Sequence, residues 1–251
     1  MKIGIAGYGK MGVLIRQRAL AGGHEVPVVV DPFSEAPEVT NRELTANSLP
    51  LDVIIDFTRP NVAMENIRRY GDLKISAVVG TTGWYNRLDQ VKEIVGNSGI
   101  GLIWSGNFSL GVNLLFYLVK TAGRVMNRFP QYDVAVHEYH HRNKADSPSG
   151  TAEMLGNLIV DSMDRKTARV SGPLDRQIAE NELNISSTRA GSMPGTHQVI
   201  FDSEVDTIIL EHSARNRTGF ADGALLAAEW IAGRSGLFSI DDLMRSIIGE
   251  E

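Results

Sequence analysis

The residues best suited to chemistry in this sequence lie close together, between positions 136 and 152. Three of the chain's 6 histidines fall there, with Lys144, two carboxylates and a Pro-Ser-Gly-Thr turn. Alternating apolar residues over 133–139 predict a strand, and 150–158 predict a helix with Ser149 as its N-cap. The polar cluster is therefore expected where a strand ends and a helix begins. The free N–H groups at a helix start favour a bound carboxylate or phosphate.

Three interpretations of this cluster remain open on composition alone. It could be a solvated polar loop, as an arbitrary histidine-rich loop usually is. It could be a metal site, although the adjacent His140 and His141 on extended backbone point to opposite faces and cannot easily bind one ion. It could also be a catalytic loop, in which a histidine donates a proton and Lys144 faces an anionic substrate.

The N-terminus carries a glycine-rich turn between a strand at 1–6 and a helix at 11–21. Gly7, Gly9 and Gly12 form the pattern Gly-x-Gly-x-x-Gly. The first glycine permits a tight turn, the second lets a pyrophosphate approach the backbone, and the third lets the helix pack on the strand. A second strand at 25–30 ends in Asp31, placed where an acid can bind a ribose hydroxyl. The alternative is a glycine-rich turn with no ligand.

Strands and helices alternate through the rest of the first half. Strands are predicted at 52–57, 75–79 and 101–104, and helices at 60–70 and 88–95. This alternation predicts an α/β fold with a doubly wound parallel sheet. Small and polar residues follow the strands, at the edge where such sheets bind ligands: Gly80, Thr81, Thr82, Ser105, Gly106 and Asn107. For Thr81, Thr82 and Asn107, ordinary turn and cap chemistry is the alternative interpretation.

The second half has a different pattern. A long helix at 110–128 precedes the histidine cluster, and 163–183 is polar, with a Gly172-Pro173 break and no clear core. Strands at 184–189, 197–202 and 207–213 have no helices between them, which predicts a second, antiparallel or mixed sheet. Helices are predicted at 220–231 and 239–248.

Composition excludes several classes of protein. A formal charge of −5 argues against a nucleic-acid-binding protein, and the absence of cysteine excludes disulfides and thiolate chemistry. No apolar run approaches the roughly 20 residues that span a bilayer. The N-terminus already reads as a strand and not as a leader, so a cytoplasmic protein is expected.

The histidine cluster closely resembles the signature of the 4-hydroxy-tetrahydrodipicolinate reductase (dihydrodipicolinate reductase) family. Asp56-Phe57-Thr58, Gly80-Thr81-Thr82-Gly83 and Asn107-Phe108-Ser109 are similar to that family's cofactor-contacting loops. The matching positions of the signature are Glu138, His140, His141, Lys144, Asp146, Pro148, Ser149, Gly150, Thr151 and Ala152.

The resemblance covers essentially the whole chain. It implies a Rossmann-type doubly wound parallel sheet with an inserted α+β substrate domain built on a mixed sheet. The dinucleotide-binding domain would comprise residues 1–108 plus 219–251, and the substrate-binding and oligomerisation domain residues 109–218. The resemblance also implies a homotetramer that assembles through the substrate-domain sheets.

The resemblance further implies reduction of 4-hydroxy-tetrahydrodipicolinate, a small dicarboxylate, with NADH or NADPH and no metal. His140 would donate the proton and Lys144 would hold or polarise the substrate. The substrate-binding residues would be His141, Ser149, Gly150 and Thr151. The cofactor-binding residues would be Gly7, Tyr8, Gly9, Lys10, Met11, Asp31, Gly80, Thr81, Thr82, Ser105, Gly106, Asn107, Phe108 and Arg217, although Arg217 could equally be a surface arginine.

Two departures from the family pattern concern cofactor choice. The glycine loop is one residue shorter, with Lys10 where arginine is common, and Pro32 stands where an arginine often follows Asp31. Two other functions are kept as alternatives. One is a different two-domain dehydrogenase, such as an amino-acid dehydrogenase, and the other is a non-catalytic NAD(P)-sensing protein with a solvated histidine loop.

Overall fold

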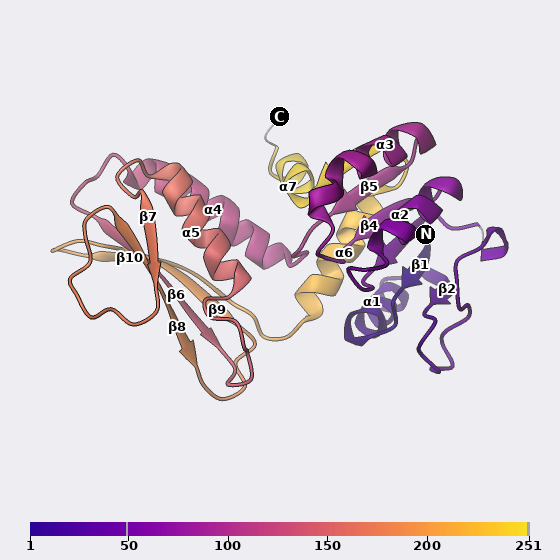
Figure 1. Cartoon of the computed structure of the whole chain (residues 1–251), viewed down its shortest axis with the longest axis horizontal. Helices are drawn as coiled ribbons and strands as arrows, with labels where there is room; N and C mark the ends of the chain where they lie inside the picture. Colours follow the sequence, from indigo (N-terminus) through magenta and orange to yellow (C-terminus); the bar gives the residue numbers. More distant parts are fainter. Residues whose placement is uncertain (49, 250–251) are drawn as a thin grey trace. The chain divides into compact units, whose positions relative to one another are not determined.

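The computed structural model describes residues 1–48 and 50–249. The chain divides into two compact units. One contains Met1–Leu110 and the C-terminal segment from Thr218, and the other is Gly111–Arg217. The two ends of the chain thus build one unit, which holds both the indigo and the yellow segments, and the middle of the chain builds the other (Figure 1).

The first unit contains a six-stranded sheet in which every neighbouring pair of strands is parallel. Its spatial order is β11-β5-β4-β3-β1-β2. The predicted doubly wound parallel sheet is confirmed. The strands are β1 (Lys2–Ala6), β2 (Glu25–Val30), β3 (Val53–Asp56), β4 (Ser76–Val79), β5 (Gly101–Trp104) and β11 (Gly236–Ser239).

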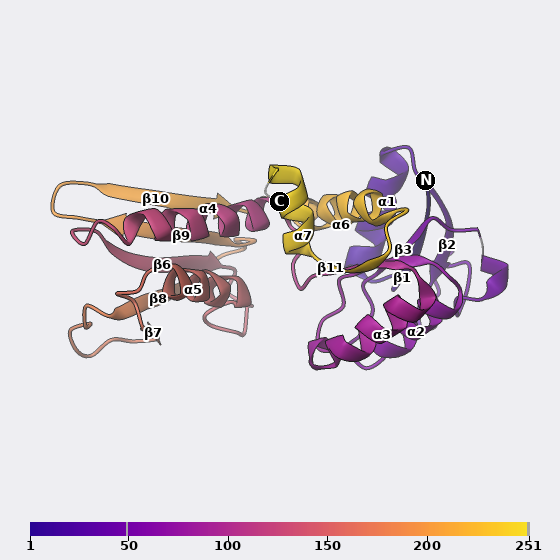
Figure 2. The ribbon, with the colours of Figure 1, turned by 90° about the horizontal axis from the view of Figure 1, so that it is seen from above.

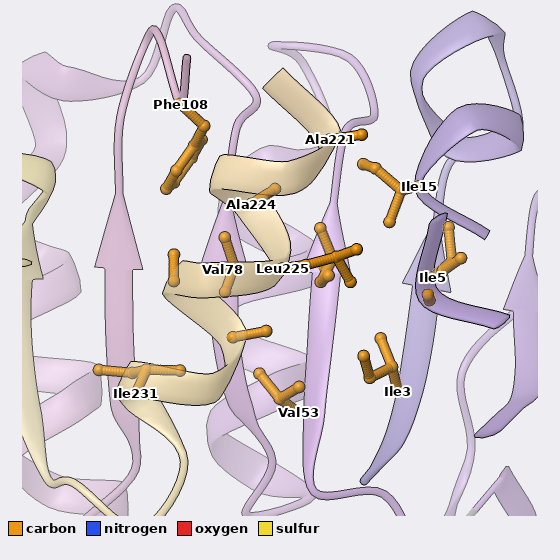
Figure 3. Packing of buried hydrophobic residues seen from close by; sticks show 14 of the residues in the cluster. Ile3, Ile5, Ile15, Val53, Val78, Phe108, Ala221, Ala224, Leu225 and Ile231 are labelled. Carbon is orange, nitrogen blue, oxygen red and sulfur yellow. The ribbon is translucent and has the colours of Figure 1, made fainter. Parts of the chain in front are cut away.

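Helices cover both faces of this sheet (Figure 2). One face packs against α1 (Lys10–Ala21), α6 (Thr218–Ile231) and α7 (Ile240–Ile248), and the other against α2 (Ala63–Asp72) and α3 (Leu88–Ser98). Figure 3 shows α6 from the first group, with Ala224 and Leu225 facing the strand residues Val53 and Val78. Because both faces are covered, the strands are largely apolar, and the burial of their side chains stabilises the unit.

Strand β11 is absent from the sequence-based prediction, which placed only helices after residue 220. The strand has four residues and lies at the sheet edge, paired in parallel with β5. It begins at Gly236, whose φ of +131° is in the region that favours glycine. So short a segment shows no periodicity that separates a strand from a turn, which explains the omission.

The second unit contains a five-stranded sheet of order β10-β9-β6-β8-β7. Strands β6 and β8 are parallel, whereas β9 is antiparallel to both of its neighbours, so the sheet is mixed as predicted. Helices α4 (Leu110–Met126) and α5 (Gly150–Ser162) share one apolar core with it. The strands are β6 (Asp133–His140), β7 (Ala168–Ser171), β8 (Glu182–Arg189), β9 (Thr196–Asp202) and β10 (Thr207–Ser213).

The polar segment 163–183 is more ordered than the sequence indicates. It contains β7, and it is held by Lys166, whose side chain is only 1% exposed. The Lys166 ammonium donates to the backbone carbonyls of Glu180 and Glu182 and lies 2.6 Å from the Asp133 carboxylate. A fully paired buried lysine is compatible with a folded core, whereas composition alone suggests a solvated loop.

The two faces of the mixed sheet differ in burial. Along β6, Val134, Val136 and Glu138 are buried, and the alternating residues His137 and Tyr139 remain partly exposed.

In the part of the chain that the structure describes, no helix is both long and apolar enough to cross a membrane.

Candidate active site

The glycine turn joins β1 to α1, and at Gly7 and Gly12 it leaves room only for backbone. Gly7 has a φ of +87°, and a Cβ on it would lie 2.5 Å from the carbonyl oxygen of Phe57. A Cβ on Gly12 would lie 2.0 Å from the carbonyl oxygen of Gly7, so this glycine is needed for the close approach of helix and turn. A Cβ on Gly9 would have no neighbour within 4 Å. The open side of Gly9 is where a pyrophosphate could approach the helix start.

Asp31 lies directly after β2 and is bound to the backbone around it. Its carboxylate accepts N–H groups from Tyr8 at 2.8 Å, Phe33 at 2.8 Å and Ser34 at 3.1 Å. Burial alone would raise the pKa of Asp31, but these three donors and the nearby Arg59 lower it below its ordinary value. Asp31 therefore carries a negative charge at neutral pH and joins the glycine turn to the loop after β2.

A cavity of about 670 Å³ opens beside Asp31. Gly7, Tyr8, Gly9 and Asp31 line it, and so do three arginines that the sequence analysis did not single out. Arg42 donates to the carbonyl oxygens of Pro32 and Ser34, and Arg59 lies over the Phe33 ring, 4.8 Å from its centroid. Arg69, the third, pairs with Glu43. Lys10, in contrast, is exposed and is not among the described residues that line this cavity.

The loops after β3 and β4 are tied to each other by the buried carboxylate of Asp56. Its Oδ1 accepts from the Thr58 backbone and from the Thr58 and Thr81 hydroxyls. Its Oδ2 accepts from the Asn66 amide and from the Tyr70 hydroxyl at 2.7 Å. The Thr81 side chain is thus engaged inside the protein, whereas Thr82 is exposed. Gly80 packs against Phe57, because a Cβ on it would lie 2.3 Å from the ring.

The loop after β5 uses its polar side chains for local structure. The Ser105 hydroxyl donates to the carbonyl of Asn107 and accepts the Asn107 N–H. Asn107 Oδ1 accepts the N–H of Ser109 at 2.8 Å, next to the start of α4. Phe108 is only 1% exposed as a whole residue, and its side chain belongs to the core. Such contacts are ordinary turn and cap chemistry, the alternative interpretation given above for Asn107. Gly106, in the same loop, is exposed.

At the end of β6, Glu138 and His140 lie on the same buried face because strand side chains alternate. His140 Nδ1 lies 2.7 Å from Glu138 Oε2. The β6–β9 register pairs Glu138 with His197, whose ring centroid is 5.2 Å from that of His140. Burial lowers the pKa of His140, and it lowers that of His197 to about 4.

Lys144 follows this strand end in a turn. Its backbone N–H donates to the carbonyl of His141, and its ammonium lies 2.8 Å and 2.9 Å from the two carboxylate oxygens of Asp146. The Asp146 side chain is 58% exposed, so the ion pair is solvated and weak. His141 is partly exposed, and its ring is perpendicular to that of His140, with centroids 6.5 Å apart.

Helix α5 begins beside these residues. Ser149 caps it as predicted, since its Oγ accepts the N–H of Ala152 at 3.2 Å. The same Oγ lies 3.2 Å from His197 Nε2, and the Ser149 N–H donates to Glu138. Gly150 and Thr151 form the first turn, whose N–H groups have no acceptor within a helix. His140, Lys144 and this helix start therefore lie around one short segment of chain.

Arg217 is exposed and is the last residue of the second unit. Among the described residues, Glu138, His140 and His197 form a group that could hold a metal ion, with ligand atoms all within 4.8 Å of one another. In the sequence, only the adjacent His140 and His141 suggest such a site, and their side chains point to opposite faces of the extended backbone. His197 could not be found from the sequence, because it reaches the group through the pairing of β6 with β9.

The parallel sheet, the glycine turn at a helix start and the acid after β2 define a nicotinamide dinucleotide-binding fold of the dehydrogenase class. Two family models match the chain: "Dihydrodipicolinate reductase, N-terminus" over residues 1–108 and "Dihydrodipicolinate reductase, C-terminus" over residues 111–244. The chain belongs to the dihydrodipicolinate reductase family and is an oxidoreductase.

Individual relatives agree with this membership. A 4-hydroxy-tetrahydrodipicolinate reductase from Christiangramia forsetii is 34% identical over 98% of this chain and 99% of its own length. One from Methanoregula boonei is 35% identical over 94% of this chain and 91% of its own. The solved structure of a dipicolinate-bound dihydrodipicolinate reductase from Paenisporosarcina sp. TG-14 has a TM-score of 0.78 at 24% identity, covering 95% of this chain and 97% of that one. This last similarity concerns the fold.

Proposed function

We propose that this chain reduces 4-hydroxy-tetrahydrodipicolinate to tetrahydrodipicolinate in lysine and diaminopimelate biosynthesis, with NADH or NADPH as cofactor. Family membership supports this reaction. The observation that carries it is the convergence of His140, Lys144 and the start of α5 within one segment. These groups together supply an acid, a fixed cation and helix N–H donors, which suits a ring that bears two carboxylates.

The first unit is suited to hold the cofactor. Gly9 leaves open space at the start of α1, and Gly7 and Gly12 bring the turn close to the helix. Asp31 presents a carboxylate at the rim of the 670 Å³ cavity, where a ribose could bind. A bound reduced nicotinamide dinucleotide supplies the hydride.

In the second unit, we assign His140 as the proton donor, because an imidazole can carry and release a proton. Burial lowers the pKa of His140, and the Glu138 carboxylate beside it favours the protonated ring. Lys144 binds or polarises the substrate, and its solvated pair with Asp146 is easily exchanged for a substrate carboxylate. His141, Ser149, Gly150 and Thr151 surround the helix start, which binds one carboxylate through N–H groups. A coupled assay that makes the precursor from aspartate semialdehyde and pyruvate and follows the absorbance of reduced nicotinamide tests the activity.

Planar analogues of the substrate test the recognition of two carboxylates. We expect pyridine-2,6-dicarboxylate to compete with the substrate, and pyridine-2-carboxylate to bind roughly 10-fold more weakly or worse, because a charged donor is then left unpaired. Inhibition constants measured in the coupled assay give the comparison. Equal inhibition by the two compounds would show that only one carboxylate is recognised.

Cofactor preference depends on Asp31 and the charges around it. Asp31 favours the ribose hydroxyls of NADH and repels the 2′-phosphate of NADPH, while Arg42 and Arg59 in the same cavity offset that repulsion. A partly screened contact of this kind is worth on the order of 1 kcal/mol. We therefore expect both cofactors to work, with kcat/KM for NADH equal or modestly higher, and Asp31→Asn to move the ratio towards NADPH.

The matched control for this ratio is Glu43→Gln, which removes another acid that lines the cavity but is paired with Arg69. It should leave the preference unchanged. A tenfold or larger preference of the unaltered chain for NADPH would mean that the basic residues outweigh Asp31.

We also propose a cytoplasmic homotetramer built through the second unit. The partly exposed face of its sheet, which includes His137 and Tyr139, is a surface on which another copy could pack. Sedimentation should give about four times the mass of one chain. Replacing Tyr139 by aspartate should shift the mass towards smaller species, and a monomer in the unaltered chain would contradict the proposal.

A further inference from the structure

The Glu138 side chain is fully buried at the centre of the second unit's polar cluster. One of its oxygens, Oε1, is fully engaged by three donors: the Ser149 N–H at 2.9 Å, the Ser187 hydroxyl at 2.8 Å and the Arg189 guanidinium at 2.7 Å. Burial would raise the pKa of Glu138, but the bonds from Ser149, Arg189 and Ser187 lower it to about 2. Glu138 is therefore a carboxylate at neutral pH, although no solvent reaches it.

The other oxygen, Oε2, faces two histidines. It lies 2.7 Å from His140 Nδ1 and 3.8 Å from His197 Nε2. Across the described residues, neither Oε2 nor His140 Nδ1 has a hydrogen-bond partner of ordinary geometry, so the 2.7 Å ion-pair contact between them is what compensates both atoms. A buried carboxylate oxygen and a buried ring nitrogen are costly to leave unpaired, so the proton between them belongs on Nδ1.

A direct contact explains this geometry better than a metal ion. Zinc bonds to nitrogen and oxygen are about 2.0–2.2 Å long, so two ligands on one tetrahedral ion lie more than about 3 Å apart. The separation of 2.7 Å between Glu138 and His140 is shorter than that and suits a charge-assisted hydrogen bond.

The second ring nitrogen of His140 is kept clear by a glycine. A Cβ on Gly195 would lie 2.8 Å from His140 Nε2, and Gly195 has a φ of +142°, where other residues are strained. Gly195 belongs to the loop that connects β8 to β9. The loop therefore approaches His140 closely while placing no side chain against Nε2.

We propose that Glu138 is a positioning residue that fixes the proton of His140 on Nδ1 and so makes Nε2 the atom that delivers a proton to the substrate. This inference rests on the proposed function of His140. In the protonated ring both nitrogens carry hydrogen. Nε2 gives its proton to the substrate, Nδ1 keeps the one shared with Glu138, and the neutral ring is protonated again at Nε2 from water. The hydride comes from the reduced nicotinamide, so no other reactant is needed.

Charges on all sides of His140 enter its titration. Burial is the largest influence and lowers the pKa of His140, Glu138 opposes it, and Lys144 and Arg189 lower the pKa further. His197, on β9, is largely neutral near pH 7 and adds little charge. Removing the negative charge of Glu138 should therefore lower the pKa of His140. Because the acid form is the reactive one, kcat should then begin to fall at a lower pH than in the unaltered chain.

The test compares Glu138→Gln with Glu153→Gln. Glutamine is nearly the same size as glutamate and keeps an oxygen for the Ser149 N–H, but its amide can no longer hold a proton on Nδ1 by charge. Glu153 lies in α5 of the same unit and makes an ion pair with Arg169 at 2.8 Å. Nitrogen-15 NMR of the histidine rings, with His140 assigned by its absence in His140→Ala, reports the tautomer and the pKa directly.

In the unaltered chain and in Glu153→Gln, we expect neutral His140 to carry its hydrogen on Nδ1. Glu138→Gln should lose this preference, and its kcat should fall roughly 10²-fold with cofactor affinity unchanged, as expected for a general acid held in the wrong tautomer. If Glu138→Gln does not fold, the unaltered chain alone decides, since hydrogen on Nε2 there overturns the inference. An unchanged tautomer and pKa in a folded Glu138→Gln overturns it as well.

The NMR result also separates this inference from the proposed function. A chain with no activity on the dicarboxylate precursor but with His140 held in the Nδ1–H form by Glu138 would refute the reaction and keep the positioning role. A chain that is active, but whose His140 tautomer is the same with and without the charge of Glu138, would support the reaction and refute the positioning role.

Discussion

Replacing Lys144 by alanine is expected to lower kcat by roughly 10²-fold or more, and replacing His140 by alanine should do the same. Lys144 carries a positive charge that can face an anionic substrate, whereas its partner Asp146 is itself an acid. His140 is the buried imidazole at the end of β6. Steady-state kinetics in the coupled assay measure both effects.

The cofactor gives the internal control for these variants. The glycine turn and Asp31 belong to the first unit, so the dissociation constant for NADH, followed by fluorescence titration, should change little. Lys120→Ala, which removes an exposed lysine from α4 of the second unit, should leave kcat within a factor of about two. A near-normal kcat in Lys144→Ala or His140→Ala would mean that the histidine cluster is a solvated loop with no part in the reaction.

Replacing Asp56 by alanine is expected to destabilise the protein by roughly 3–5 kcal/mol. Its carboxylate is 0% exposed and accepts five hydrogen bonds from four residues, Thr58, Asn66, Tyr70 and Thr81. The variant removes the acceptor of the buried Tyr70 and Thr81 hydroxyls, whereas the Thr58 N–H and the Asn66 amide keep second acceptors. Each unsatisfied buried group costs about 1–3 kcal/mol before relaxation. Burial and then the charge of Asp56 raise the pKa of Tyr70 well above its ordinary value, which agrees with a tight contact.

Urea denaturation of Asp56→Ala measures this loss, and Asp72→Ala, at an exposed position at the end of α2, is the control. The control should change the free energy of unfolding by less than about 0.5 kcal/mol. Asp56 also fixes the loops that hold Thr58 and Thr81, so the affinity for NADH should fall in the same variant. A loss of stability below about 1 kcal/mol would mean that water replaces the carboxylate at little cost.

The first unit was largely predictable because its signals are local. Strand–helix alternation specifies a doubly wound sheet, and the glycine turn and Asp31 each depend on a few neighbouring residues, as does the Ser149 cap in the second unit. The two short strands, β7 and β11, carry too few residues for a periodic signal. Lys166 gives no local indication that it is buried, because its partners Asp133, Glu180 and Glu182 are at least 14 residues away in the sequence.

The site could be predicted only in part, for the same physical reason. His140 and Lys144 belong to one continuous motif, and Glu138 could have been added because it shares a strand face with His140. His197 and Gly195 approach this face through the pairing of strands that are distant in sequence, which no spacing reveals. Arg42 and Arg59 likewise reach the cavity near Asp31 from separate loops. The roles of Thr81 and Asn107 in turns and caps were anticipated as an alternative.

The most direct test of the proposed reaction follows deuterium from the nicotinamide to the product. The chain is supplied with NADH dideuterated at C4 and with the precursor made from aspartate semialdehyde and pyruvate, and the product is analysed by mass spectrometry. A tetrahydrodipicolinate that has gained one deuterium, formed by the unaltered chain at a rate that Lys144→Ala lowers roughly 10²-fold, is the expected result. A chain that binds the cofactor and yields no labelled product would contradict the proposed function.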